Sequence, residues 1–208
     1  MTTKPERIQG AKACVFDTYG TLLDYSAAAA RHKEVLGPRC QNIGDSWRRK
    51  QLEYTWLRSM MKQYVPFSQV TEEALRFSLK CCQYTRDNES PVHVVCELLL
   101  KEYNRLPPYP EVKNALSQLK ARGYKLAVLS NGTPQMLKEG VASAGLQEGL
   151  FDELISVDEV QVYKPDPQVY ALAMRKLGLD SPQEVCYVSG NGWDVAGAAN
   201  FGFQTRMD

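Results

Sequence analysis

Four short apolar runs constrain the fold of this chain more than any other feature of its sequence. They span residues 13–16, 126–129, 154–157 and 185–188, and each ends in small or polar residues. Continuous apolar runs of this length are typical of strands that are buried on both faces. Helix-like segments near residues 111–122, 134–144, 167–177 and 193–200 alternate with the later runs. The alternation predicts an α/β fold with a Rossmann-like parallel sheet between helices.

Glycine and proline support the boundaries of these helices. Pro134 and Pro167 stand at first-turn positions, where a missing backbone N–H costs nothing. Gly123, Gly145 and Gly178 follow three of the helices, where a left-handed cap is expected.

A different region separates the first run from the others. Residues 25–105 are nearly free of strand pattern and predict a helical bundle inserted as a cap, with the core formed by residues 1–24 and 106–208. Apolar residues recur there at helical spacing, at Leu52, Trp56, Leu57, Met60 and Tyr64, and again at Leu75, Leu79 and Cys82. The proline-rich stretch 107–110 reads as a stiff linker back into the core.

Composition excludes several classes of function. A chain of 208 residues is expected to form one catalytic unit, and 25 Lys and Arg against 24 Asp and Glu give no global field for nucleic acid or an anionic membrane. The first residues lack a signal peptide and no apolar run could span a bilayer, so a cytoplasmic protein is expected. The six cysteines lack paired spacing and are interpreted as reduced thiols. No G-x-S-x-G motif supports a serine hydrolase.

Chemically informative residues gather where the predicted strands end. Asp17 follows the first run, residues 130–133 the second and residues 189–194 the last, while Lys164 lies shortly after the third. Ligands of parallel sheets bind beyond these carboxyl ends. A carboxylate there needs a compensating cation, which Lys164 can supply, and an ionised, partly dehydrated carboxylate is a usable nucleophile. Taken alone, Asp17 could equally be a turn or capping acid.

Four motifs in order carry a resemblance to a known family. They are Phe16-Asp-Thr-Tyr-Gly-Thr-Leu22, Leu129-Ser-Asn-Gly132, Val162-Tyr-Lys-Pro-Asp166 and Ser189-Gly-Asn-Gly-Trp-Asp194. Together they resemble the haloacid dehalogenase superfamily, and the match is closest to the L-2-haloacid dehalogenases. The segment Trp47–Leu57 is also similar to the cap helix of those enzymes, so the resemblance covers nearly the whole chain.

The resemblance implies hydrolysis of small (S)-2-haloalkanoic acids to (R)-2-hydroxyalkanoic acids through a covalent aspartyl ester, with inversion and without cofactor or metal. The implied catalytic residues are Asp17, Thr21, Arg48, Ser130, Lys164, Tyr170, Ser189, Asn191 and Asp194. The implied substrate-binding residues are Thr18, Tyr19, Leu52, Phe67, Asn131 and Trp193. Asp17 would be the nucleophile, Asp194 would orient or deprotonate water, and Arg48 with Asn131 and Trp193 would receive the halide.

The expected partners are therefore the 2-haloacid substrate and the halide product, with no nucleic acid and no membrane. The resemblance also implies a homodimer. In that family the chain usually continues from about Phe203 through a last strand, a loop and often another helix. Many relatives carry Gln where this chain has Arg49, which is left outside the catalytic set.

Other interpretations stay open on sequence alone. A magnesium-dependent phosphatase of the same superfamily would carry a second Asp at position 19, which is Tyr here, although Asp194 leaves a magnesium site possible. A non-catalytic binding module on the same scaffold is a third class. Arg48 could belong to a solvated charge cluster with Arg49 and Lys50, and Tyr170 could be a core residue.

Overall fold

A five-stranded parallel sheet forms the core of the protein. The computed structural model describes residues 9–84, 91–146 and 149–206. Its strands are β1 (Ala13–Phe16), β2 (Lys125–Ser130), β3 (Glu153–Ser156), β4 (Val185–Val188) and β5 (Gln204–Arg206). The order is β3-β2-β1-β4-β5, so the chain leaves the central strand first toward one edge and later toward the other. The crevice between β1 and β4 is therefore the place where a ligand site is expected.

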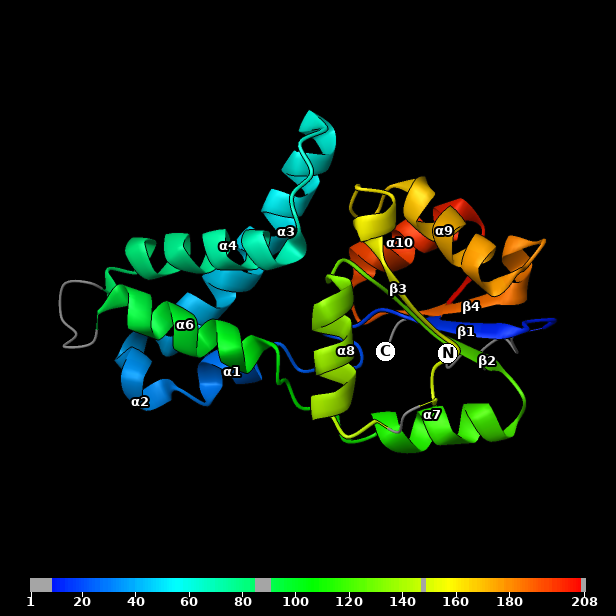
Figure 1. The fold of residues 1–208 in the computed structure, drawn as a ribbon, viewed down its shortest axis with the longest axis horizontal. Helices are drawn as coiled ribbons and strands as arrows, with labels where there is room; N and C mark the ends of the chain where they lie inside the picture. Colours follow the sequence, from blue (N-terminus) through cyan, green and yellow to red (C-terminus); the bar gives the residue numbers. More distant parts are fainter. Residues whose placement is uncertain (1–8, 85–90, 147–148, 207–208) are drawn as a thin grey trace, which may run out of the picture.

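Helices cover both faces of this sheet. The helices α7 (Val112–Ala121) and α8 (Pro134–Ser143) lie on one face, and α9 (Pro167–Leu177) and α10 (Gly192–Phe201) lie on the other (Figure 1). The central strands β1 and β4 are buried along their whole length. The predicted α/β class, the positions of the first four strands and the left-handed glycines Gly123, Gly145 and Gly178 are confirmed.

A separate group of helices forms the cap. It consists of α1 (Ala27–Ala30), α2 (Lys33–Leu36), α3 (Cys40–Met61), α4 (Phe67–Cys81) and α6 (Val92–Tyr103), all beside the sheet in Figure 1. The long helix α3 packs closely on α4 and also contacts α1. The chain returns to the core near Pro108, which pairs with Leu23 in an isolated bridge. The cap therefore lies over the end of the sheet that carries Asp17.

The apolar stripe proposed for α3 is wrong in part. The helix buries Ile43, Ser46, Trp47, Gln51 and Thr55, not the predicted stripe. Leu57 is 41% exposed and Met60 is 71% exposed. The reason is that polar side chains on the inner face find partners there: Gln51 donates to Thr71 Oγ1 at 3.0 Å. The face of α3 that the residue types predict as buried is therefore rotated by part of a turn from the face that the structure buries.

The last strand, β5, was not identified from the apolar pattern. Gln204, Thr205 and Arg206 are polar and half-buried, so they lack the signature of a doubly buried strand. They pair in parallel with Cys186, Tyr187 and Val188 of β4. The other edge strand, β3, does carry an apolar run, so the two edges of the sheet differ in the signal that their sequences give.

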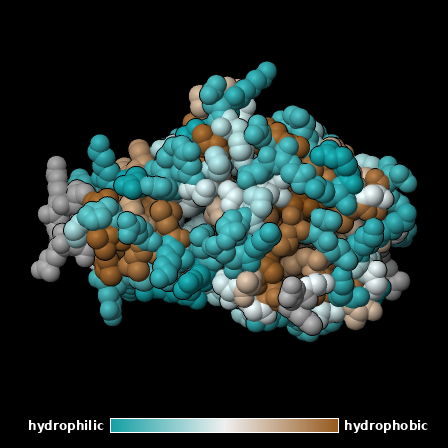
Figure 2. All heavy atoms as spheres, in the orientation of Figure 1, coloured by the Kyte–Doolittle hydropathy of each residue, from teal (hydrophilic) through white to brown (hydrophobic). Residues whose placement is uncertain are grey.

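The face of the protein shown in Figure 2 is largely hydrophilic, as expected for a chain with 25 basic and 24 acidic residues. Hydrophobic residues gather on this face in patches over both the cap and the core. Within the described ranges, no helix has both the length and the apolar character to cross a membrane.

Replacement of Gly197 by alanine should destabilise the core. A Cβ at this position in α10 would lie 2.5 Å from the Tyr170 hydroxyl and 2.6 Å from the Pro165 Cβ. We expect Gly197→Ala to lower the free energy of unfolding by about 1–3 kcal/mol through overpacking, despite the better helix propensity of alanine. Thermal or urea unfolding measures this. Gly44→Ala, whose Cβ meets one alanine Cβ at 3.3 Å, is the comparison and should cost less.

Candidate active site

Asp17 lies directly after β1, at the crevice where the strand order reverses. Its backbone N–H donates to the carbonyl of Val188 at 3.0 Å, which fixes it beside the end of β4. Gly20 follows with φ of 86°, and this left-handed residue turns the chain back over the carboxylate. The Asp17 carboxylate is nearly buried, with the residue 7% exposed.

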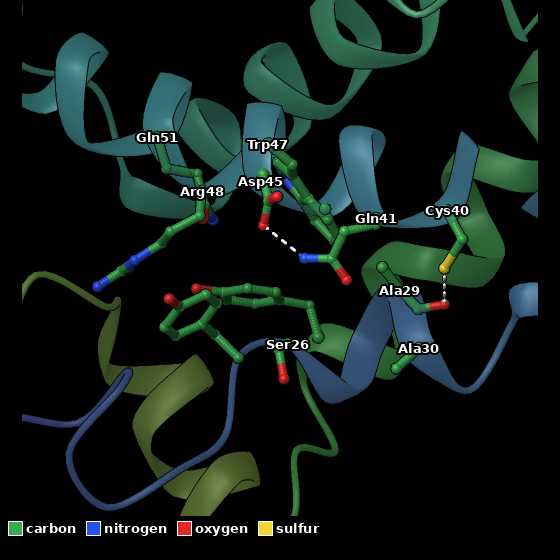
Figure 3. Close-up of a pocket in the computed structure, with 12 residues that line it drawn as sticks. Ser26, Ala29, Ala30, Cys40, Gln41, Asp45, Trp47, Arg48 and Gln51 are labelled. Atoms are coloured by element: carbon green, nitrogen blue, oxygen red, sulfur yellow. Dashed lines mark hydrogen bonds between the residues drawn. The ribbon is translucent and has the colours of Figure 1, made fainter. Parts of the chain in front are cut away.

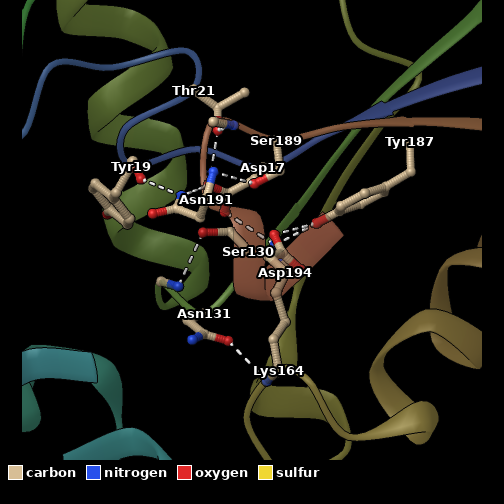
Figure 4. A network of polar contacts seen from close by, with 12 residues as sticks. Asp17, Tyr19, Thr21, Ser130, Asn131, Lys164, Tyr187, Ser189, Asn191 and Asp194 are labelled. Atoms are coloured by element: carbon tan, nitrogen blue, oxygen red, sulfur yellow. Dashed lines mark hydrogen bonds and ion pairs between the residues drawn. The ribbon is translucent and has the colours of Figure 1, made fainter. Parts of the chain in front are cut away.

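Three side chains donate hydrogen bonds to the Asp17 carboxylate (Figure 4). Oδ2 accepts from Thr21 Oγ1 at 3.0 Å and from Asn191 Nδ2 at 2.8 Å. Oδ1 accepts from Lys164 Nζ at 3.0 Å. These donors stabilise the negative charge that burial would otherwise disfavour. These residues therefore meet at the ends of the strands, as the sequence predicts.

Lys164 connects this carboxylate to a second one. Its ammonium lies 2.9 Å from Asp194 Oδ2, and Lys164 and Asp194 are both essentially inaccessible to solvent. Tyr170 donates to Asp194 Oδ1 at 2.9 Å. Tyr187 occupies a place between Lys164 and Asp194, accepting from Nζ at 2.6 Å and donating to Oδ2 at 2.7 Å. Asp194 is therefore held through both of its oxygens.

Burial and charge act against each other in this network. Burial disfavours the ammonium of Lys164, but the charges of Asp17 and Asp194 outweigh it and hold the Lys164 pKa above its ordinary value. Burial raises the pKa of Asp194, and the charge of Asp17 adds to this, while Lys164 and the Tyr187 hydroxyl oppose it. Burial, with the nearby Asp194 charge, also raises the pKa of Tyr187, so its phenol keeps its proton.

Arg48 reaches the site from the cap. Its guanidinium donates to the carbonyl of Tyr19 and to Asn191 Oδ1, each at 3.0 Å. It also lies over the ring of Tyr25, 4.6 Å from the ring centroid. Asn191 thus joins Arg48 to Asp17, since its other amide atom donates to the carboxylate. The interpretation of Arg48 as a purely solvated charge does not hold.

A small cavity of about 90 Å³ lies beside Arg48 within the cap. Figure 3 shows the guanidinium extending past Gln51 and over aromatic rings. Tyr25 and Tyr103 also line this cavity. Burial raises the pKa of Tyr103 to about 12. The side chain of Arg48 is therefore enclosed by aromatic and polar groups on its cap side.

The remaining polar candidates lie near the carboxylate without bonding to it. Ser130 Oγ accepts from the Gly132 N–H at 3.1 Å, and Ser189 Oγ accepts from the Asn191 N–H at 3.1 Å, so both hydroxyls shape their own loops. Asn131 Oδ1 accepts from the backbone N–H of Lys164 at 3.1 Å. Thr18 Oγ1 is buried and has no hydrogen-bond partner among the described residues.

The apolar candidates divide into two groups. The Tyr19 ring packs on Phe67 at 5.7 Å and on Tyr103 at 5.1 Å, forming an aromatic wall between core and cap. Trp193 packs edge-on against Trp56 at 5.5 Å. These two tryptophans and Lys164 line a groove of about 460 Å³.

Leu52 lines a neighbouring hollow of about 400 Å³. It shares this hollow with Arg48 and Tyr25 and with Trp56 of the second group.

Sequence reasoning missed Tyr187 and Tyr25. Tyr187 was hidden inside the apolar run Val-Cys-Tyr-Val, where it counted only as a strand residue. A tyrosine in a doubly buried strand, two residues before Ser189 and thus on the same side, is the signal that could have found it. Tyr25 gave no such signal, because only the tertiary structure brings it under Arg48.

The arrangement suits nucleophilic attack by a carboxylate. A buried, hydrogen-bonded Asp17 faces a cation from the cap, and a second carboxylate lies on the other side of Lys164. Such a pair can form a covalent ester and then direct water to it.

Comparisons with known proteins identify the family. The sequence matches the haloacid dehalogenase-like hydrolases over residues 11–202, and the chain belongs to this family of enzymes. It is 49% identical over 194 residues to an (S)-2-haloacid dehalogenase from Pseudomonas sp. (strain YL), covering 93% of this chain and 81% of that one. It is 42% identical to haloacetate dehalogenase H-2 of Moraxella sp. (strain B), covering 93% and 83%.

A solved structure shows the same fold. The L-2-haloacid dehalogenase of Xanthobacter autotrophicus, with chloropropionic acid covalently bound, superposes with a TM-score of 0.84 at 44% identity. The match covers 95% of this chain and 77% of that one. The resemblance recognised from the motifs is therefore confirmed.

Loss of the Lys164 ammonium should destabilise the protein in a pH-dependent way. Lys164→Met leaves Asp17 and Asp194 buried without their cation, and we expect a loss of about 3–5 kcal/mol near neutral pH. The groups facing Asp194 are Asp17, Lys164, Tyr170 and Tyr187. Without the lysine the Asp194 pKa rises further, so protonation relieves the charge as the pH falls. Unfolding measured at about pH 5 and about pH 8 should show the larger loss at the higher pH.

Lys176→Met is the matched control. Lys176 pairs with Glu159 on the surface, where an ion pair contributes at most about 1 kcal/mol. An equal loss for Lys164→Met at both pH values would contradict the role of Lys164 as a counter-ion.

Proposed function

We propose that this enzyme hydrolyses the carbon–halogen bond of small (S)-2-haloalkanoic acids and releases (R)-2-hydroxyalkanoic acids and halide. The main structural support for this reaction is the nearly buried Asp17 carboxylate, with Lys164 on one oxygen and the cap residue Arg48 beside it. The names of the similar enzymes, and the covalently bound chloropropionic acid of one solved relative, support the same reaction.

In the first step, Asp17 attacks the halogen-bearing carbon. Oδ2 already accepts two hydrogen bonds, whereas Oδ1 accepts one from Lys164, so Oδ1 keeps a lone pair for the attack. The new C–O bond forms as the C–halogen bond breaks, and the halide leaves with the bonding electrons. In-line displacement inverts the carbon centre and gives an ester of Asp17.

The substrate carboxylate and the departing halide are held by different groups. Ser130 and the backbone amides near Thr18 and Tyr19 hold the carboxylate. Arg48, with Asn131 and the Trp193 ring, receives the halide, because a guanidinium is a weakly hydrated cation suited to a large anion. The groove beside Lys164 and Trp193 and the ring of Tyr19 leave room for a short alkyl chain.

In the second step, water cleaves the ester at the Asp17 carbonyl carbon. Asp194 takes one proton from the attacking water, the acyl C–O bond to the substrate breaks, and the product oxygen takes up that proton. The second water proton leaves to solvent as the Asp17 carboxylate is restored. Lys164 stabilises the charge that develops beside it, while Ser189 and Asn191 fix the loop that leads into the first turn of α10, where Asp194 lies. Thr21 keeps the nucleophile in place, and Tyr170 holds Asp194. Leu52 and Phe67 contribute the apolar cap side of the pocket.

The organisation of the protein follows from this reaction. We divide the chain into a core of residues 1–24 and 106–208 and a cap of residues 25–105, with the active site between them. The exposed apolar residues of α3 and α4, Leu57, Met60, Met61 and Phe77, support a homodimer that forms through the cap. A cytoplasmic location agrees with a small charged substrate and with six cysteines that form no disulfide among the described residues.

The phosphatase alternative is not favoured. Position 19 holds a tyrosine whose ring packs in the aromatic wall, where a phosphatase would need an acid for its leaving group. A departing halide needs no proton, so the tyrosine is compatible with dehalogenation.

Halide release is the direct test. We expect chloride release from (S)-2-chloropropionate in the presence of EDTA, with (R)-lactate as product on chiral analysis. Asp17→Asn should lower the rate by about 10³-fold or more, because it removes the nucleophile. Asp24→Asn, which alters a nearby turn acid bonded to Ser26, should keep activity. A folded wild-type enzyme that releases no halide would contradict the proposal.

Two variants of Tyr25 test the placement of Arg48. Tyr25→Leu removes the ring beneath the guanidinium, and we expect kcat/KM to fall by up to about tenfold. Tyr25→Phe keeps the ring and should retain most of the activity. Steady-state halide release measures both. Equal losses in the two variants would show that the hydroxyl matters, and not the stacking.

A further inference from the structure

The hydroxyl of one buried tyrosine contacts both members of the Lys164–Asp194 ion pair. Tyr187 is fully buried in β4, and its hydroxyl contacts Lys164 Nζ at 2.6 Å and Asp194 Oδ2 at 2.7 Å (Figure 4). None of the roles described above requires this hydroxyl. A phenylalanine would fill the same space among Tyr170 and Phe203, whose rings pack against Tyr187.

The direction of each hydrogen bond is fixed by chemistry. An ammonium has three hydrogens and no lone pair, and those of Lys164 point to Asp17 Oδ1, Asp194 Oδ2 and the Tyr187 oxygen. The Tyr187 oxygen must accept from Lys164, so its single hydrogen is directed to Asp194 Oδ2. Asp17, Asp194 and Tyr187 together therefore accept all three hydrogens of the lysine ammonium.

The number of hydrogen bonds that each atom accepts also distinguishes the two oxygens of Asp194. Oδ2 accepts from Lys164 and Tyr187, which fills both of its in-plane lone pairs. Oδ1 accepts from the Tyr170 hydroxyl at 2.9 Å and keeps one lone pair. Without the Tyr187 hydroxyl, Oδ2 would also have a free lone pair, and the carboxylate could turn about its bond to Cβ.

From this geometry we propose that Tyr187 is a positioning residue for ester hydrolysis, which orients Asp194 so that Oδ1 is the atom that takes the proton from water. The inference rests on the proposed function, since it assigns an atom within the second step. In that step the water oxygen bonds to the Asp17 carbonyl carbon and its proton passes to Asp194 Oδ1. The acyl C–O bond to the substrate then breaks, and the alkoxide oxygen takes up this proton to become the hydroxyl of the product. The second water proton leaves Asp17 to solvent.

The first step should not depend on Tyr187. Attack by Asp17 Oδ1 on the halogen-bearing carbon involves Lys164, Arg48 and Asn191, and the Tyr187 hydroxyl bonds to neither oxygen of Asp17. Loss of the hydroxyl should therefore separate the two steps kinetically. A purely structural role would change both steps together, or would change stability alone.

Tyr187→Phe tests the inference with rapid-quench kinetics on (S)-2-chloropropionate. We expect the initial halide burst to keep its rate and ester hydrolysis to slow roughly 10- to 100-fold, the effect of one lost hydrogen bond to a charged group. The Asp17 ester should then accumulate, which intact-protein mass spectrometry after acid quench detects. Tyr84→Phe, which removes another fully buried phenol within the cap, is the matched control and should change neither step.

The pH profile of ester hydrolysis gives a second readout. The groups that face Asp194 are Asp17 after β1, Lys164 before α9, Tyr170 on α9 and Tyr187 on β4. The Tyr187 hydrogen bond stabilises the ionised carboxylate, so its loss should raise the Asp194 pKa and move the acid limb to higher pH. Tyr187→3-fluorotyrosine, a more acidic phenol and stronger donor, should move this limb to lower pH.

The outcomes are distinguishable. An unchanged ratio of burst rate to ester hydrolysis rate in Tyr187→Phe, or equal slowing of both, overturns the inference. The ratio of the two rates does not depend on the fraction of enzyme that is folded. If Tyr187→Phe does not fold, the pH profile of the 3-fluorotyrosine variant tests the inference instead. Absence of any halide release by the wild-type enzyme would overturn the proposed function itself, and not only the role of Tyr187.

Discussion

The buried ammonium of Lys164 is the interaction on which the site depends. Asp17 and Asp194 both lie in the interior, and two carboxylates of like charge this close would destabilise the fold without a cation. Lys164 contacts one oxygen of each, at 3.0 and 2.9 Å. Thr21, Asn191 and Tyr170 donate to the other oxygens, and Tyr187 donates to the Asp194 oxygen that Lys164 also contacts. The network is stable because every charge in it has a partner.

The parallel sheet brings these groups together from distant parts of the chain. The order β3-β2-β1-β4-β5 places the ends of β1 and β4 side by side, so Asp17 and the segment that begins at Ser189 share one crevice. Lys164 enters from the loop before α9. Asp17 lies 147 residues before Lys164, and Lys164 lies 30 residues before Asp194. Three separate segments thus form one network, and no one of them is chemically informative alone.

The cap completes the site by supplying a cation that the core lacks at that position. Arg48 bridges to Asn191 and to the Tyr19 carbonyl, while Tyr25 supports its guanidinium from below. The aromatic contacts of Tyr19 with Phe67 and Tyr103 fix the cap against the core on the same side. Both the cap and the core therefore determine the position of the Arg48 guanidinium.

The sequence by itself determined the class of fold, the family and most of the site. Doubly buried strands need continuous apolar runs, and the motifs at their ends stand at fixed distances from those runs, so local pattern was enough to find Asp17, Lys164 and Asp194. It did not determine the inner face of α3, where Gln51 and Thr55 are buried and Met60 is exposed, because buried polar residues depend on partners from another helix.

Nor did the sequence reveal β5 or the roles of Tyr187 and Tyr25. The strand β5 has no apolar signature, and a tyrosine within a buried strand looks like any other core residue. Only the tertiary structure decided that one phenol lies between Lys164 and Asp194 and that another lies beneath Arg48. The physical reason is that each such contact depends on the positions of both partners, and these partners belong to different elements of the structure.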